Sequence, residues 1–180
     1  MNILSKIHNR NIVIISAIIT VLVFLALRHF DNPLHTSVAP KGIISFEFAK
    51  NVDTANQIIN SWDTQAKINA GLSLGIDYLF LFAYSILFSA ICFFISVNNQ
   101  ARNAIIHKIG IILSYLLLIA GVFDAIENFA LIKLLLGSQA EIYPIIAFYF
   151  ASGKFMILAL GIIYIIFFGI LANIFSKIKN

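Results

Sequence analysis

Four long apolar stretches divide the chain, and polar residues gather between them. The stretches cover about residues 11–27, 72–97, 109–136 and 145–175. A helix rises ~1.5 Å per residue, so each stretch is of the length needed for the ~30 Å hydrocarbon core of a bilayer. The pattern predicts an all-α integral membrane protein, a four-transmembrane-helix bundle that forms one domain over residues 1–180.

The first apolar stretch also has some features of a secretory signal peptide. Lys6 and Arg10 precede it, as basic residues precede such a peptide. No small-x-small cleavage pattern follows before Arg28, however. We therefore expect this stretch to be retained as a helix.

The composition agrees with a membrane protein and excludes several other classes. Of the 180 residues, 61% are hydrophobic and only 11% are charged, too few to cover the surface of a soluble domain. The basic residues form no stripe with interleaved aromatics, so no nucleic-acid partner is expected. The single cysteine, Cys92, excludes an intramolecular disulfide and a cysteine-based metal site.

The distribution of basic residues predicts the orientation of the helices. Basic side chains occur in the amino-terminal segment, in the connection between the second and third stretches, and in the carboxyl-terminal tail: Lys6, Arg10, Arg102, Lys108, Lys177 and Lys179. These three segments lie on one side of a four-helix protein. By the positive-inside rule that side is cytoplasmic, which predicts a multi-pass protein of the bacterial inner (plasma) membrane with both termini in the cytoplasm.

The outer loop, residues 28–71, is too long to be only a connector. Residues 42–48 are β-prone, which predicts an extended segment, and Asp53 or Thr54 can cap a short amphipathic helix that reaches Trp62. The apolar face of this helix would comprise Ala55, Ile58, Ile59 and Trp62. We expect an interfacial anchor with Trp62 at headgroup depth in preference to a functional cover over the bundle.

Four ionisable residues lie well inside the apolar stretches, namely Asp77, Asp124, Glu127 and Lys154, whereas Lys133 lies close to the outer end of the third stretch. A charge at the centre of a span costs ~2.5–3.5 kcal/mol on insertion scales, so each needs a partner or a water-filled cavity. Glu127 and Lys154 each lie about 15 Å from the outer end of their helix, with Asp124 one turn deeper. These groups should therefore converge in the outer half of the bundle.

The helical periodicity adds polar and aromatic neighbours to the cluster. Asp124, Glu127 and Asn128 share one helix face, and Asp77 shares a face with Tyr84. The predicted ligand-binding residues are Asp77, Tyr84, Asp124, Glu127, Asn128 and Lys154. Phe80, Tyr84, Phe123 and Phe155 would supply aromatic walls, and Trp62 would be the outer-loop cover if it had a function.

The predicted cluster has more acids than bases. Three carboxylates face one ammonium, since Lys133 can extend to the interface. Either an acid is protonated or a cation is bound. The structural alternative is that Lys154 pairs with Glu127, Asp124 bonds to Asn128, and Asp77 meets water. The outer loop also contains two histidines and a carboxylate, His29, Asp31 and His35. Their spacing matches no rigid set of metal ligands, so neither a metal nor a cofactor is expected.

Several of these positions form a pattern that resembles a known group of proteins. The pattern comprises Phe46-Glu47-Phe48-Ala49, Ile58, Trp62, Asp77-Tyr78-Leu79-Phe80, Tyr84, Asp124-Ala125-Ile126-Glu127-Asn128 and Lys154-Phe155. It resembles an uncharacterised family of bacterial four-helix integral membrane proteins, which implies that these positions form one site but implies no activity. In helix number and membrane-embedded carboxylates the chain also resembles, more loosely, the emopamil-binding and sigma-2 receptor type proteins.

Three functions remain open from the sequence. The first is binding of a membrane lipid or amphiphilic small molecule at the buried Asp/Glu/Lys cluster. The second is an enzyme acting on a lipid, with Asp124 or Glu127 as general acid or base. The third is an accessory or structural subunit that assembles with another membrane protein or with a second copy of this chain, its charges serving only to fix the packing of the helices.

Overall fold

The computed structural model describes residues 10–101 and 103–171, and these residues contain helices and connecting turns but no strand. The elements, in chain order, are α2 (Arg10–Asp31), the 3-10 turn η1 (Asn32–Leu34), α3 (Ile43–Glu47), α4 (Val52–Ser61), α5 (Thr64–Asn99), α6 (Ala104–Leu135), α7 (Ile142–Tyr164) and the π-helical turn η2 (Ile165–Leu171).

Four helical segments are long and apolar enough to cross a membrane, as the sequence predicted. Their bounds differ from the apolar runs. Helix α5 begins at Thr64 and not near residue 72, because the side chain of Asp63 accepts a hydrogen bond from the Ala66 amide at 2.7 Å and starts the helix among polar residues. Helix α7 passes into η2 at Ile165, and the last part of the predicted stretch, residues 172–175, lies outside the described residues.

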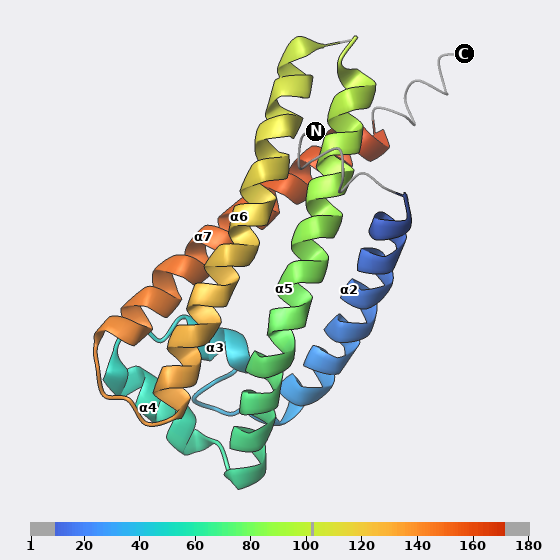
Figure 1. Cartoon of the computed structure of the whole chain (residues 1–180). Helices are drawn as coiled ribbons and strands as arrows, with labels where there is room; N and C mark the ends of the chain where they lie inside the picture. Colours follow the sequence, from blue (N-terminus) through green and yellow to red (C-terminus); the bar gives the residue numbers. More distant parts are fainter. Residues whose placement is uncertain (1–9, 102, 172–180) are drawn as a thin grey trace.

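The long helices form a row and not a closed ring. Helix α2 packs on α5, α5 on α6 and α6 on α7, whereas α2 and α7 share no comparable contact in the described residues (Figure 1). Small residues bring α5 and α6 close together: at Gly121, a Cβ atom would lie only 3.0 Å from Ser85 Oγ. One side of the bundle, between α2 and α7, is consequently left open.

The segment between α2 and α5 covers one end of the bundle, at the bottom of Figure 1. We call η1, α3, α4 and their connections, residues 32–63, the cap. Helix α4 follows Asn51, whose side chain accepts a hydrogen bond from the Thr54 amide at 2.8 Å. Asn51 is therefore the N-cap, and the expectation of Asp53 or Thr54 in that role is wrong.

The prediction of an extended segment over residues 42–48 is also wrong, because α3 occupies most of it. The amide of Ile43 donates a 2.8 Å hydrogen bond to Asp31 Oδ1. Gly42 has φ +57°, and a Cβ there would collide with the Asp31 carboxylate. The contact with Asp31 thus fixes a helical turn that the β-prone sequence does not favour locally.

Trp62 lies inside the protein and not at a surface. Its side chain is 2% exposed, its indole nitrogen donates to the Leu34 carbonyl at 2.9 Å, and its ring centroid lies 5.4 Å from that of Phe46. The expected interfacial anchor is therefore wrong. The buried face of α4 packs against the ends of α6 and α7 in one cluster, which includes Ala55, Ile58, Trp62, Leu131, Leu134 and Ala147.

Candidate functional site

Lys154 is the centre of a buried charge cluster beneath the cap. Lys154 is 5% exposed, and its Nζ lies 2.7 Å from Asp124 Oδ1 and 2.9 Å from Glu127 Oε2. The two acids stand three residues apart on α6, so one ammonium on α7 reaches both. The depth argument from the sequence thus places these three groups together correctly.

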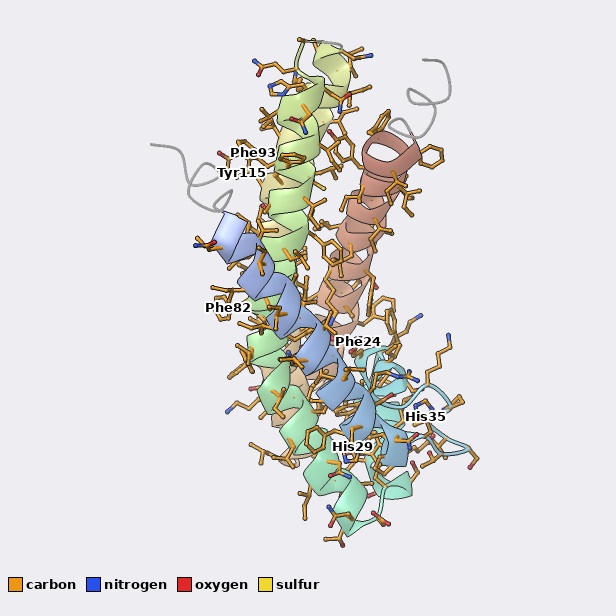
Figure 2. All side chains as sticks on the ribbon, turned by 90° about the vertical axis from the view of Figure 1, so that its right-hand side faces the viewer. Phe24, His29, His35, Phe82, Phe93 and Tyr115 are labelled. Atoms are coloured by element: carbon orange, nitrogen blue, oxygen red, sulfur yellow. The ribbon has the colours of Figure 1, made fainter. Side chains whose placement is uncertain are left out.

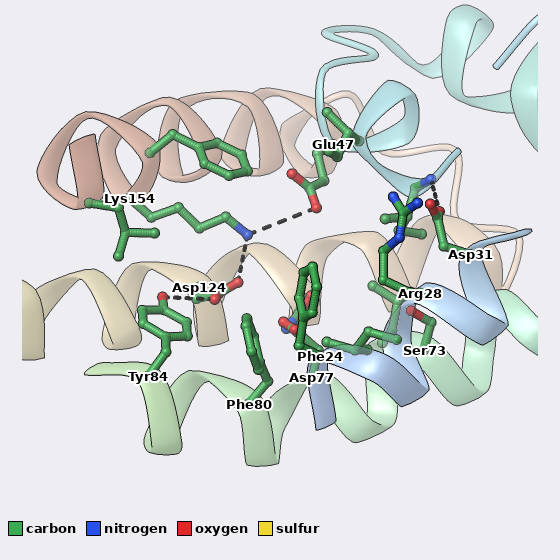
Figure 3. A pocket seen from close by; sticks show the side chains of 17 residues that line it. Phe24, Arg28, Asp31, Glu47, Ser73, Asp77, Phe80, Tyr84, Asp124 and Lys154 are labelled. Carbon is green, nitrogen blue, oxygen red and sulfur yellow. Dashed lines mark hydrogen bonds and ion pairs between the residues drawn. The ribbon is translucent and has the colours of Figure 1, made fainter. Parts of the chain in front are cut away.

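Asp124 is held through both carboxylate oxygens. Oδ1 contacts Lys154, and Oδ2 accepts a hydrogen bond from the Tyr84 hydroxyl at 2.9 Å. Tyr84 reaches it from α5, so three helices meet at this one carboxylate (Figure 3). Charge-assisted hydrogen bonds of this kind fix a side chain firmly.

Asp77 forms a second polar contact, apart from Lys154. The side-chain amide of Asn128 donates to Asp77 Oδ2 at 2.5 Å, joining α5 to α6. Asn128 therefore bonds Asp77, and not Asp124 as in the structural alternative above. Asp77 forms no ion pair in the described part of the chain, so its carboxylate has a neutral partner only.

Glu47 is a member of the cluster that the sequence did not place there. It is the last residue of α3, is 8% exposed, and its Oε1 lies 3.9 Å from Lys154 Nζ. Its other oxygen, Oε2, has no hydrogen-bond partner among the described residues. Burial raises the pKa of Glu47 above the ordinary value of 4.5, and the charge of Lys154 opposes this only in part.

A signal for Glu47 was present in the sequence. It is a lone carboxylate between Phe46 and Phe48, in a segment otherwise rich in apolar residues. The resemblance pattern also contained it. Its position could not be derived from the spans, because it enters the cluster from the cap.

A cavity of about 270 Å³ lies against this cluster, between α2, α3, α5, α6 and α7. Its polar lining includes Arg28, Asp31, Glu47, Ser73, Asp77, Tyr84, Asp124, Asn128 and Lys154. Its apolar lining consists of Phe24, Leu27, Ile43, Ile44, Leu74, Phe80, Phe155 and Leu158. Phe24 is 50% exposed and Phe155 39% exposed, so the cavity opens on the side where α2 and α7 do not pack together. Figure 2 shows Phe24 on α2.

The predicted site residues divide into three groups by position. Asp77, Tyr84, Asp124, Asn128 and Lys154 line the cavity. Glu127 is fully buried, contacts Lys154, and does not line the cavity. Trp62 lies in the core of the cap, where it supports Phe46 next to Glu47.

The predicted aromatic walls are placed in part. Phe80, Tyr84 and Phe155 line the cavity, together with Phe24 from α2. Phe123 does not, since its ring packs edge to face on Phe150 with centroids 5.0 Å apart. Its place between α6 and α7 is favoured by Gly153, where a Cβ would meet the Phe123 ring at 2.9 Å.

Within the described residues, no three His, Cys, Asp or Glu side chains are arranged so as to bind a metal ion. His35, part of the loop trio considered above, contacts Asp31 at 3.0 Å and the Pro40 carbonyl at 3.0 Å. Asp31 is further engaged by the Ile43 amide, so its role is to hold α3.

The chain matches no protein-family model, and neither a curated protein nor a solved structure shows significant similarity to it. Function is therefore argued from the geometry of the site.

Proposed function

We propose that this protein spans the bacterial inner membrane with its four long helices and binds a lipid-like or amphiphilic small molecule in the cavity beneath the cap. The observation that carries the proposal is the cavity itself, which has partly exposed aromatic walls from α2 and α7 and buried charges in the same lining. A mostly apolar pocket with a few convergent polar groups is the usual form of a small-molecule site.

The surface of the helices supports membrane insertion. Large apolar side chains are more than half exposed on all four long helices, among them Leu22, Phe82, Phe94, Val122, Phe129, Tyr149 and Met156. A soluble monomer rarely exposes so large a continuous apolar surface. In a bilayer the same side chains would contact lipid, and the opening between α2 and α7 would face the hydrocarbon.

The cost of the buried charges supports a functional role for them. Ionisable groups inside a membrane are expensive and commonly mark binding sites or transport pathways. Packing alone needs one partner for Lys154, whereas three carboxylates surround it and Asp77 lies nearby with no cation. An amphiphile would place its polar head at these charges and its chain along the aromatic walls.

A cavity-filling substitution tests the proposal. Leu158 lines the cavity, whereas Leu160, on the same helix, is 48% exposed and does not line it. We expect Leu158→Trp to lose bound amphiphile and the matched control Leu160→Trp to keep it, as measured by native mass spectrometry of protein extracted in mild detergent. If Leu158→Trp carries the same species in the same amount as the parent, the proposal is wrong. A parent protein that carries no amphiphile, and takes up none that is added, contradicts it as well.

A further inference from the structure

The charges around the cavity do not balance. Five carboxyl groups line it or contact Lys154, namely Asp31, Glu47, Asp77, Asp124 and Glu127. Two cations, Arg28 and Lys154, face them. With all five acids ionised, the two cations leave a net charge of −3. In a low-dielectric surrounding such an excess favours protonation of some acids or a bound cation.

Lys154 cannot neutralise the whole site. Its ammonium already has Asp124 and Glu127 at 2.7 and 2.9 Å, with Glu47 farther away at 3.9 Å. One positive charge cannot balance three carboxylates, and the contact with Glu47 is too long for a hydrogen bond. Asp77 is left without a cation, bonded only to the neutral amide of Asn128.

Arg28 does not fill this role either. It lines the cavity from the last turn of α2, but it makes no ion pair with any of the five acids in the described part of the chain. Asp31, its neighbour on α2, is engaged by the Ile43 amide and His35.

One buried acceptor is open toward the cavity. Glu47 is more than nine-tenths buried, lines the cavity, and its Oε2 has no hydrogen-bond partner among the described residues. Figure 3 shows its carboxyl group above the cavity, on the side of Lys154 and across from Asp77. Leaving a buried acceptor unpaired is costly, so this atom needs a hydrogen-bond donor. The neighbouring Glu127 carboxyl can donate to Glu47 only when it is protonated, and a bound ligand is the other source of a donor.

Aromatic rings form the adjoining wall. The ring centroids of Phe24 and Phe80 lie 6.3 Å apart, and those of Phe80 and Tyr84 lie 5.2 Å apart. Phe24 and Phe80 line the same cavity as Glu47 and Asp77. The faces of such rings attract cations, and the rings also offer apolar surface to a hydrocarbon chain.

We propose, on the basis of the amphiphile-binding function above, that the bound amphiphile carries a protonated amine, which lies between Glu47 and Asp77 while its hydrocarbon chain leaves through the opening between α2 and α7. The amine donates hydrogen bonds to Glu47 Oε2 and to the Asp77 carboxylate. It supplies the positive charge that Lys154 and Arg28 do not. The class of ligand is therefore a long-chain primary amine and not a fatty acid or a fatty alcohol.

Three probes with the same chain and different heads test this inference: hexadecylamine, hexadecanol and hexadecanoic acid. Binding of each to the full-length protein in mild detergent is measured by titration in native mass spectrometry. We expect the amine to bind at least about tenfold more tightly than the other two, since an additional charge-assisted hydrogen bond contributes roughly this factor.

Charge-removing variants locate the amine. Asp77→Asn and Glu47→Gln keep the shape of the side chain, and each should weaken binding of hexadecylamine about tenfold and binding of hexadecanol much less. Asp53→Asn is the control, because Asp53 is exposed on α4 and away from the cavity, and it should change neither. If one acid variant fails to fold, the other still tests the assignment.

The outcomes separate the two proposals. If hexadecanol or hexadecanoic acid binds as tightly as the amine, and Leu158→Trp abolishes that binding, the amine inference is overturned while the amphiphile site stands. The inference is also overturned if the preference for the amine survives in both acid variants. If none of the three probes binds, the proposed function fails and the inference fails with it.

Discussion

Lys154 shows how one residue can determine the energetics of a buried site. Its ammonium lies within 3 Å of both Asp124 and Glu127, between α6 and α7. Replacing it by methionine leaves two buried acids without their cation. Removal of one partner of a buried ion pair costs ~3–5 kcal/mol, so Lys154→Met should lower the melting temperature strongly in detergent.

The double substitution tests whether the two groups are coupled. Adding Glu127→Gln to Lys154→Met removes one of the uncompensated acids and should recover part of the lost stability. If the free energies of the two single changes simply add, Lys154 and Glu127 are not coupled and the cluster is misassigned.

The burial of Glu47 predicts how the stability of the protein depends on pH. Burial raises the pKa of Glu47 in the native state, so ionisation costs the folded protein more than the unfolded one. The contribution of the neutral form to stability is present below the ordinary pKa of 4.5 and is lost as the pH rises through the higher native pKa.

Glutamine at position 47 cannot ionise and avoids this loss. The melting temperature of Glu47→Gln should therefore rise relative to the parent as the pH is raised from about 4 to about 8. The exposed Asp53→Asn serves as the control, and its difference from the parent should not follow this trend. A difference for Glu47→Gln that is constant with pH, or that favours the parent at high pH, contradicts the assignment.

At the scale of the elements, α3 depends on a contact between distant residues. Gly42 adopts φ +57° beside Asp31, which holds the Ile43 amide. Gly42→Ala should cost about 1–3 kcal/mol from backbone strain alone, and the collision with Asp31 should loosen α3 and displace Glu47. Hydrogen exchange over residues 43–48, together with the melting temperature, measures both effects.

Gly75→Ala is the matched control for this change. Gly75 lies in α5, and a Cβ there meets no other atom within 4 Å. Alanine is the better helix former by ~1 kcal/mol, so this variant should be neutral or more stable. Equal exchange rates over residues 43–48 in the parent and Gly42→Ala would show that the Asp31 contact does not hold α3.

The elements differ in how far the sequence alone predicts them. The long helices follow from apolar runs, which need no tertiary information, and depth along the helix was enough to bring Asp124, Glu127 and Lys154 together. Helix α3 and the place of Glu47 depend on Asp31, a contact across the cap that no local pattern shows. The partner of Asn128 required the rotation of α6 against α5, which spacing along one helix cannot give.

At the scale of the whole molecule, the cap and the turn between α5 and α6 lie at opposite ends of the bundle. With the basic residues setting the orientation, we predict the cap outside and that turn in the cytoplasm. In a Cys92→Ser background, a cysteine at exposed Gln57 should react with an impermeant reagent only from outside, and one at exposed Ala101 only from inside. Labelling of Gln57→Cys from the cytoplasmic side alone would reverse the proposed topology.

The open side of the bundle is the feature that relates the fold to the proposed function. A closed ring of four helices would isolate the buried charges, whereas the row of α2, α5, α6 and α7 leaves a route from the surface of the helices to Lys154. Phe24 and Phe155, both partly exposed, stand at this route.

The most direct test of ligand binding is to map where a photoreactive amphiphile attaches to the protein in membranes. With the reactive group near the polar head, the account predicts adducts on cavity residues such as Phe24, Phe155 and Leu158, which excess unlabelled amphiphile removes. Adducts spread over exposed apolar residues outside the cavity, such as Leu22 and Met156, and insensitive to competition would contradict it.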